Sequence, residues 1–307
     1  MRYRILGRTG LSVSALGLGT VELGRDWGIQ VPGEYGAPSE EAALGLLTRA
    51  VELGVNFLDT ARYYGKSEER IGKFLAGLGR DAVQVHVATK LPANKKAGLA
   101  AMRRGMTADL DSSLAALGRE PLDLVQFHSA SLEDIRDAEG WEVLAKARAA
   151  GKLRFIGASF YDAAAARAAV ESGAYDTIQP TYNLAMPEAG AVIDLAFEKK
   201  VGVIVKTPLG KGLFSYKRAH ATGQALAASR RAADALAFLE RSDQTLPQAA
   251  IRWCLAKLGV STVIAGTQRV RHLEENAEAV EGELLAEELA RVEELRRAGA
   301  FEGFEIP

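Results

Sequence analysis

The feature that most constrains the fold is a repeated alternation of short β-rich segments with alanine- and leucine-rich segments of helical periodicity. Apolar residues that recur every three or four positions predict amphipathic helices, such as residues 40–54 and 140–152. Between the helices lie eight apolar segments of strand length: residues 13–19, 56–60, 83–90, 122–129, 153–159, 177–183, 201–207 and 261–267. Eight strand–helix units are the number found in a (β/α)8 TIM barrel, so the alternation predicts an α/β fold of this kind.

Three segments fall outside the repeat. Residues 1–14 predict a short hairpin before the first strand, and residues 284–299 predict an extra C-terminal helix. An insertion at 209–243 follows the seventh strand, where it would form a substrate or cofactor loop. Because no linker interrupts the pattern, we expect residues 1–307 to form a single domain.

Composition narrows the possible functions. The chain has 38 basic and 39 acidic residues, a balance that argues against nucleic acid or an anionic membrane as a partner. Its single cysteine, Cys254, excludes an intramolecular disulfide and a four-thiolate metal site. We find no apolar run of the ~20 residues that a membrane-spanning helix needs, and no signal-peptide pattern. We therefore expect a cytoplasmic protein, whose oligomeric state the sequence leaves open.

Polar residues stand at the ends of three successive predicted strands. In (β/α)8 barrels the chemistry lies at the carboxyl ends of the strands, and these positions hold Asp59, Lys90 and His128. A lysine in the barrel mouth needs a carboxylate partner, which Asp59 on the adjacent strand supplies. Tyr64 could reach the same mouth, where a nearby ammonium would ease loss of its proton. The alternative is a purely structural ion pair.

Strand alternation predicts which way the third strand faces. Val83, Val85 and Val87 share one face, which should meet the helices. Lys90 lies on the other face and should point into the barrel mouth.

At this point four segments together resemble the aldo-keto reductases: "GVNFLDTARYYGKSEERIGKFL", "VATK", "DSSLAALGREPLDLVQFH" and "IRWCLAKLGVSTVIAGTQRVRHLEENAEAV". The resemblance implies a barrel that reduces aldehydes and ketones with a nicotinamide cofactor and without a metal. It implies a catalytic tetrad of Asp59, Tyr64, Lys90 and His128, with Tyr64 as the proton donor and Lys90 lowering its pKa. Tyr63 would be a wall of the pocket.

The resemblance also implies a cofactor site that joins several strand ends. Its residues are Gly19, Thr20, Ser159, Gln179, Lys206, Thr207, Leu209, Gly266, Thr267, Gln268, Arg269, His272, Glu275 and Asn276. Lys206 stands where many relatives place an aromatic ring under the nicotinamide, and Phe160 or Tyr182 could partly substitute for that ring. Gln268 replaces the usual basic residue for a 2′-phosphate, although Arg269 or Arg271 could compensate. NADP is therefore the expected cofactor, with NAD as the alternative.

Three functional hypotheses remain. The first is an oxidoreductase that interconverts small carbonyl compounds, possibly sugars, and alcohols. The second is a cofactor-binding regulatory protein of the same fold, and the third is an isomerase that uses Lys90 as a Schiff-base amine. The substrate is not readable, because the loops expected to form its pocket, at 21–36, 129–135 and 209–243, follow no pattern. Trp27 could wall this pocket or cover a barrel edge.

Overall fold

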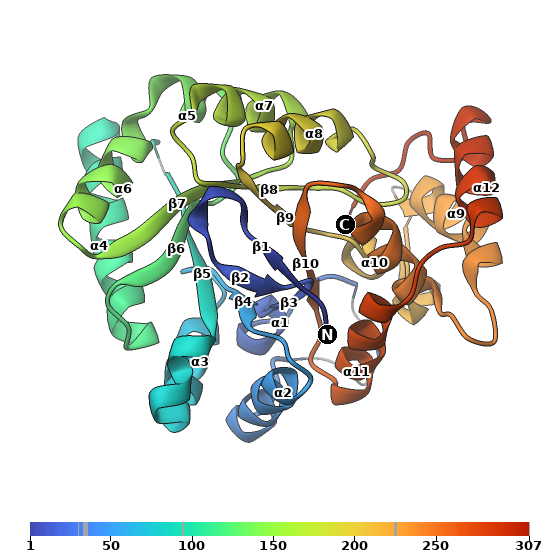
Figure 1. Cartoon of the computed structure of the whole chain (residues 1–307), viewed down its shortest axis with the longest axis horizontal. Coiled ribbons are helices and arrows are strands. Elements are labelled where there is room, and N and C mark those ends of the chain that lie inside the picture. The colour runs from blue at the N-terminus through green and yellow to red at the C-terminus, as the bar shows by residue number, and fades with distance from the viewer. Residues whose placement is uncertain (30, 33–35, 94, 224–225, 307) are drawn as a thin grey trace.

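The eight predicted strands form one closed parallel barrel in the computed structural model (Figure 1). Each strand pairs with its neighbours in sequence order, and the last strand closes the ring against the first. The strands are β3 (Leu16–Gly19), β4 (Phe57–Asp59), β5 (His86–Leu91), β6 (Leu122–Phe127), β7 (Leu153–Phe160), β8 (Thr177–Pro180), β9 (Gly202–Val205) and β10 (Val260–Gly266). The structure describes the whole chain except residues 30, 33–35, 94, 224–225 and 307. The (β/α)8 prediction is confirmed, and all carboxyl ends of the strands share one rim.

The predicted N-terminal hairpin covers the opposite, amino-terminal end of the barrel. It consists of β1 (Tyr3–Ile5) and β2 (Ser12–Ser14), paired antiparallel. Leu6 and Val13 pack with the barrel-interior side chains of Phe57 and Leu124 in one buried apolar cluster. This end of the barrel is therefore filled with apolar side chains, which leaves the other rim for polar chemistry.

Helices surround the barrel and bury their apolar faces against it (Figure 1). Several begin at side-chain caps, such as Ser39, which accepts a hydrogen bond from the Ala42 amide, and the Thr245–Gln248 capping box. The helices are α1 (Val21–Gly24), α2 (Glu40–Glu52), α3 (Ser67–Leu78), α4 (Leu99–Leu117), α5 (Leu132–Asp137), α6 (Glu139–Ala149), α7 (Ala163–Ser172), α8 (Gly190–Glu198), α9 (Ala227–Ala235), α10 (Leu246–Ala256), α11 (Val270–Glu278) and α12 (Ala286–Arg297). The predicted C-terminal helix corresponds to α12.

The third barrel strand starts later than predicted. Residues Gly79–Gln84 form a 3-10 helix, and Val83 is 71% exposed, so its expected contact with the helices is wrong. Val85 and Val87 do join the core between barrel and helices. The alternating valine pattern thus begins before the strand itself. The sequence pattern does not distinguish a valine in a 3-10 turn from one in a strand.

The insertion after β9 forms short helical turns and α9 rather than an open loop. In Figure 1 α9 is drawn on the right of the view. The hydroxyl of Ser229 donates to the Glu305 carbonyl at 2.8 Å and accepts from the Glu305 amide at 2.9 Å. These bonds tie the C-terminal residues to the insertion.

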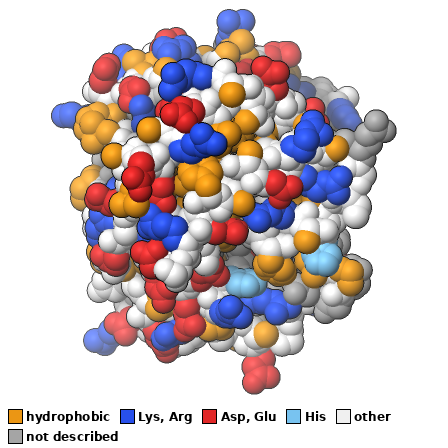
Figure 2. All heavy atoms as spheres, turned by 90° about the vertical axis from the view of Figure 1, so that its right-hand side faces the viewer, with side chains coloured by type: hydrophobic (Ala, Val, Ile, Leu, Met, Phe, Trp, Pro, Cys, Tyr) orange, Lys and Arg blue, Asp and Glu red, His pale blue; other side chains and the backbone are white. Residues whose placement is uncertain are grey.

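Basic and acidic side chains are intermingled over the face of the molecule drawn in Figure 2. This agrees with a formal net charge of −1. Among the residues that the structure describes, we find no helix that combines the length and the apolar character needed to cross a membrane.

Candidate active site

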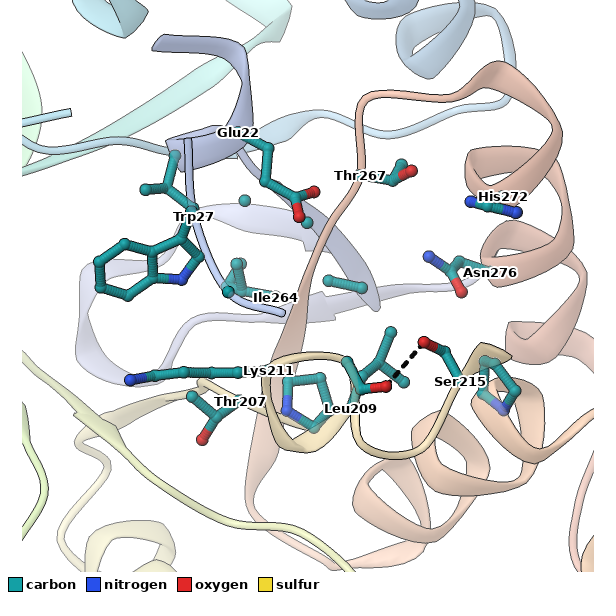
Figure 3. Close-up of a pocket in the computed structure, with 18 of the residues that line it drawn as sticks. Glu22, Trp27, Thr207, Leu209, Lys211, Ser215, Ile264, Thr267, His272 and Asn276 are labelled. Carbon is teal, nitrogen blue, oxygen red and sulfur yellow. Dashed lines mark hydrogen bonds between the residues drawn. The ribbon is translucent and has the colours of Figure 1, made fainter. Parts of the chain in front are cut away.

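A pocket of about 830 Å³ opens at the carboxyl-terminal rim of the barrel. It runs from the barrel mouth, lined by Asp59 and Lys90, to the start of α11. Figure 3 shows part of it, in which Thr267 and Asn276 lie across from Leu209 on the segment after β9. One continuous cavity therefore connects the barrel mouth with the last β–α unit.

At the bottom of the mouth lies a buried ion pair between two neighbouring strands. The Lys90 ammonium lies 2.5 Å from Asp59 Oδ1 and also donates to the Thr60 carbonyl at 2.9 Å. Asp59 Oδ2 accepts from Gln179 Nε2 at 2.7 Å. Lys90 is only 2% exposed and Asp59 5%. Burial of such charges is tolerated only when they are paired and hydrogen-bonded, and this pair meets both conditions.

Strand alternation explains why both side chains point inward. Phe57 belongs to the barrel-interior cluster and Leu58 to the outer core, so Asp59 returns to the inner face. In the same way Ala88 belongs to the interior cluster, and Lys90 lies two residues further along β5 on the same face. The ion pair thus follows from the period of the two strands.

Tyr64 reaches the mouth from the turn after β4. Its amide donates to the Ala61 carbonyl at 3.0 Å, and the turn packs tightly against Gly24 of α1. A Cβ atom on Gly24 would lie 1.6 Å from the Tyr64 carbonyl oxygen, so only glycine permits this approach. The Lys90 ammonium lies 5.1 Å from the centre of the Tyr64 ring, and the His128 ring lies 5.7 Å away, edge-on at 80°.

The local electrostatics favour neutral tyrosine and histidine beside a charged lysine. Burial raises the pKa of Tyr64, and the Lys90 charge opposes this without reversing it. The lowering effect of Lys90 that the sequence predicted is therefore present but smaller than the effect of burial. Burial would lower the pKa of Lys90, but Asp59 and Tyr64 outweigh it and raise that pKa. Burial, reinforced by Lys90 and Lys206, lowers the pKa of His128 to about 3.

Next to the ion pair, the ends of β7, β8 and β9 bring together Ser159, Gln179 and Lys206. The Lys206 ammonium donates to Ser159 Oγ at 3.1 Å. Gln179 Oε1 is buried and has no hydrogen-bond partner among the residues that the structure describes. Buried polar atoms are normally satisfied, so an orphaned acceptor on a residue that lines the pocket fits a ligand with an N–H donor, such as the carboxamide of a nicotinamide.

The aromatic group at this point differs from both rings that the sequence suggested. Phe160 is fully buried in the outer core, and Tyr182 stacks on Trp253 at 4.5 Å, so neither lines the pocket. The expectation that they substitute for a stacking ring is wrong. Tyr161 lines it instead, with the Lys206 ammonium 3.5 Å from its ring centre. Alternation could have found it, since Phe160 faces the helices and the next residue faces the rim.

The far end of the pocket is built by the segment from β10 into α11. Gln268 borders it together with Arg269 and Arg271, which are both exposed. The start of a helix carries partial positive charge, which suits a phosphate. Glu275 accepts a hydrogen bond from Thr245 Oγ1 at 2.5 Å, which fixes its side chain at the pocket edge.

Contacts between distant segments join residues that line the pocket. The Lys217 ammonium, from the insertion, lies 2.9 Å from Glu22 Oε1 on α1. Tyr216 contacts His272 of α11, with ring centres 5.2 Å apart. Trp27 also lines the pocket, so it forms part of the pocket wall, which was one of the two alternatives for this residue. Glu22 and Lys217 carried no recognisable signal in the sequence.

The structure brings all the predicted catalytic and cofactor residues to this one pocket. Tyr63, expected as a wall, is 56% exposed and lies outside the lining. Of the three loops expected to form the pocket, 21–36 and 209–243 contribute, whereas the lining near the third stops at His128. Parts of the first two loops, residues 30, 33–35 and 224–225, lie outside the described residues.

Comparison with known proteins agrees with this geometry. Residues 15–297 match the family model described as "Aldo/keto reductase family". The chain is 30% identical over 295 residues to L-galactose dehydrogenase of Arabidopsis thaliana, covering 91% of this chain and 88% of the relative. It is 28% identical over 333 residues to L-glyceraldehyde 3-phosphate reductase of Escherichia coli K12, covering 96% and 92%. A holo-form aldo-keto reductase of Bacillus halodurans superposes with a TM-score of 0.78, at 27% identity and 96% coverage of each chain.

The chain therefore belongs to the aldo-keto reductase family. Members of this family are nicotinamide-dependent oxidoreductases of carbonyl compounds, and the relatives above are named as reductases and dehydrogenases. The protein is accordingly an NAD(P)-dependent oxidoreductase.

Proposed function

We propose that this chain reduces aldehydes or ketones with NADPH, with Tyr64 as the proton donor. The observation that carries the proposal is the buried Asp59–Lys90 pair beneath Tyr64 and His128, next to the orphaned acceptor of Gln179. When bound, the nicotinamide supplies hydride. Ser159 and Gln179 would hold its carboxamide, and the residues at the start of α11 would hold the adenosine end.

Each member of the tetrad has one task in this proposal. Tyr64 holds a proton at its phenol oxygen, because burial keeps its pKa above the usual range. The Lys90 ammonium favours the phenolate that remains after transfer, and Asp59 keeps that ammonium charged. His128 is neutral at working pH and can donate one N–H to the carbonyl oxygen.

NADPH rather than NADH is proposed from the far end of the pocket. Arg269 and Arg271 border it beside the start of α11, and guanidinium groups are suited to a 2′-phosphate. Gln268 offers only neutral donors. We therefore expect a moderate preference for NADPH, not an absolute one.

The test is consumption of NADPH or NADH with a panel of sugars, small aldehydes and ketones. We expect turnover with at least one class of carbonyl compound and faster turnover with NADPH. Cofactor binding without turnover of any compound would contradict the proposal and favour the regulatory alternative. Equal rates with both cofactors would contradict only the NADPH preference.

A further inference from the structure

Lys206 places an amine in the wall of the reaction pocket, at the position where β9 ends. Its two contacts in the described part of the chain are neutral: the Ser159 hydroxyl at 3.1 Å and the face of the Tyr161 ring at 3.5 Å. The charge of Lys90, by contrast, is matched by Asp59 at 2.5 Å. A cation among neutral partners keeps more of its field for whatever enters the pocket.

This amine lies close to the proposed nicotinamide position. Ser159 Oγ is the group that would bind the carboxamide, and it lies one hydrogen bond from the Lys206 ammonium. A second hydrogen bond of ~3 Å puts the carboxamide within about 6 Å of that charge. This distance does not depend on whether any side chain stacks on the nicotinamide ring.

We infer that Lys206 makes this site discriminate between the two redox forms of the cofactor, binding the neutral reduced nicotinamide more tightly than the cationic oxidised one. The inference rests on the proposed function of the pocket. The oxidised ring, to which this carboxamide is attached, carries a positive charge, so the nearby ammonium repels it, whereas the reduced ring carries none. Lys206 would thus help to expel the oxidised cofactor after each reduction.

The difference in affinity between the reduced and the oxidised cofactor should depend on pH. Burial lowers the pKa of Lys206 to about 7, the charge of Lys90 adds to this effect, and Asp59 opposes it. Below that pH Lys206 is charged and repels the oxidised ring. Above it the amine is neutral and the repulsion is lost, so affinity for the oxidised form should rise.

Among the titratable groups in this part of the pocket, Lys206 is the main one that should change its charge around pH 7. The other groups are Lys90, Asp59, Lys211, His128, Tyr64 and Tyr161. His128, with a pKa of about 3, is neutral throughout, and burial raises the pKa of both tyrosines. Burial also lowers the pKa of Lys211, so that lysine needs its own control.

The experiment measures dissociation constants for NADP⁺ and NADPH at pH 6 and pH 9 by isothermal titration calorimetry. The quantity compared is the ratio of the two constants, in which the titration of the shared 2′-phosphate cancels. In the wild type we expect NADP⁺ to bind about tenfold more weakly, relative to NADPH, at pH 6 than at pH 9. Binding of NADP⁺ near pH 7 should also release protons, visible as a dependence on the buffer.

Three variants sharpen the test, each checked for folding by circular dichroism. Lys206→Met should make the ratio independent of pH and close to the wild-type value at pH 9. Lys206→Arg keeps a charge that does not titrate, so it should retain the low-pH ratio at both pH values. Lys211→Met should leave the pH dependence in place.

A pH dependence that persists in Lys206→Met, or one that disappears in Lys211→Met instead, would overturn the inference. A wild-type ratio that does not change with pH would overturn it as well. A protein that binds neither redox form at either pH would contradict the proposed function itself, and this inference with it.

Discussion

The two ends of the pocket are built on different physical principles. At the barrel mouth, Lys90 and Asp59 are almost completely buried, paired with each other and further hydrogen-bonded. At the far end, Arg269 and Arg271 are exposed. Charges in a site without water interact strongly, and loss of the partner of one such charge is costly in free energy. Exposed charges are screened by water and salt, so their interactions are weaker. The same substitution of a charged residue should therefore have a much larger effect at the first end.

The largest effect is expected at the buried end, for Lys90→Met. Removal of the ammonium takes away the charge that favours the Tyr64 phenolate, and we expect a loss of about 10²–10⁴-fold in kcat. It also leaves Asp59 buried with only Gln179 as a partner, at a cost of about 3–5 kcal/mol in the free energy of unfolding. Steady-state kinetics and thermal unfolding measure the two effects separately.

The double variant Asp59→Asn/Lys90→Met is the matched control. It removes both charges, so stability should largely return while activity stays lost. A single Lys90→Met variant with wild-type activity would contradict the proposed role of the lysine.

Asp59→Asn should have a smaller effect on reductase activity, and its effect on the pH dependence is diagnostic. Without the carboxylate, burial lowers the pKa of Lys90, and the ammonium tends to lose its proton. Lys90 lowers the pKa of Tyr64 more than Asp59 raises it directly. When the charges of both residues are lost, the pKa of Tyr64 should therefore rise further. The fall of reductase activity at high pH, measured as a rate profile, should move to higher pH. An unchanged profile would reduce Asp59 to a structural role.

At the exposed end of the pocket, an added charge should give a small but measurable gain in NADPH affinity. Gln268→Arg adds a guanidinium at the pocket edge, and we expect tighter NADPH binding by about 1 kcal/mol, or about fivefold. NADH, which has no 2′-phosphate, should be unaffected and serves as the internal control. Fluorescence titration gives both constants, and a parallel gain for NADH would show that the new side chain does not contact the 2′-phosphate.

The smallest effects are expected for Arg269→Ala and Arg271→Ala, tested one at a time. The arginine that faces the 2′-phosphate should weaken NADPH binding by a few-fold at low salt and less at high salt. Titrations at two ionic strengths identify it. Equal affinities of the wild type for NADH and NADPH at low salt, unchanged in both variants, would mean that the protein has no 2′-phosphate site.

The same contrast explains what the sequence could and could not predict. The barrel, the inward direction of Asp59 and Lys90, and the rim that carries them follow from strand period, which is a local property. The start of β5 could not be found in this way, because Val83 fits the strand pattern while lying in a 3-10 turn. The net pKa of Tyr64 depends on burial, which no local pattern reports.

Contacts between distant segments were also beyond the sequence. The ion pair of Lys217 with Glu22 joins residues 195 positions apart, and nothing near either residue marks it. Tyr161 was within reach, since it follows a strand whose last residue faces the helices. The family resemblance indicated Phe160 instead, which is buried and does not line the pocket.

We propose that Tyr64, and not its neighbour Tyr63, donates the proton at the barrel mouth. Single-turnover oxidation of bound NADPH by an aldehyde that the wild type reduces tests it directly, with the dissociation constant for NADPH measured alongside. We expect Tyr64→Phe to slow this step by at least about 10²-fold while cofactor affinity changes only a few-fold, and Tyr63→Phe to behave like the wild type. Equal losses in both variants, or a fast step in Tyr64→Phe, would contradict it.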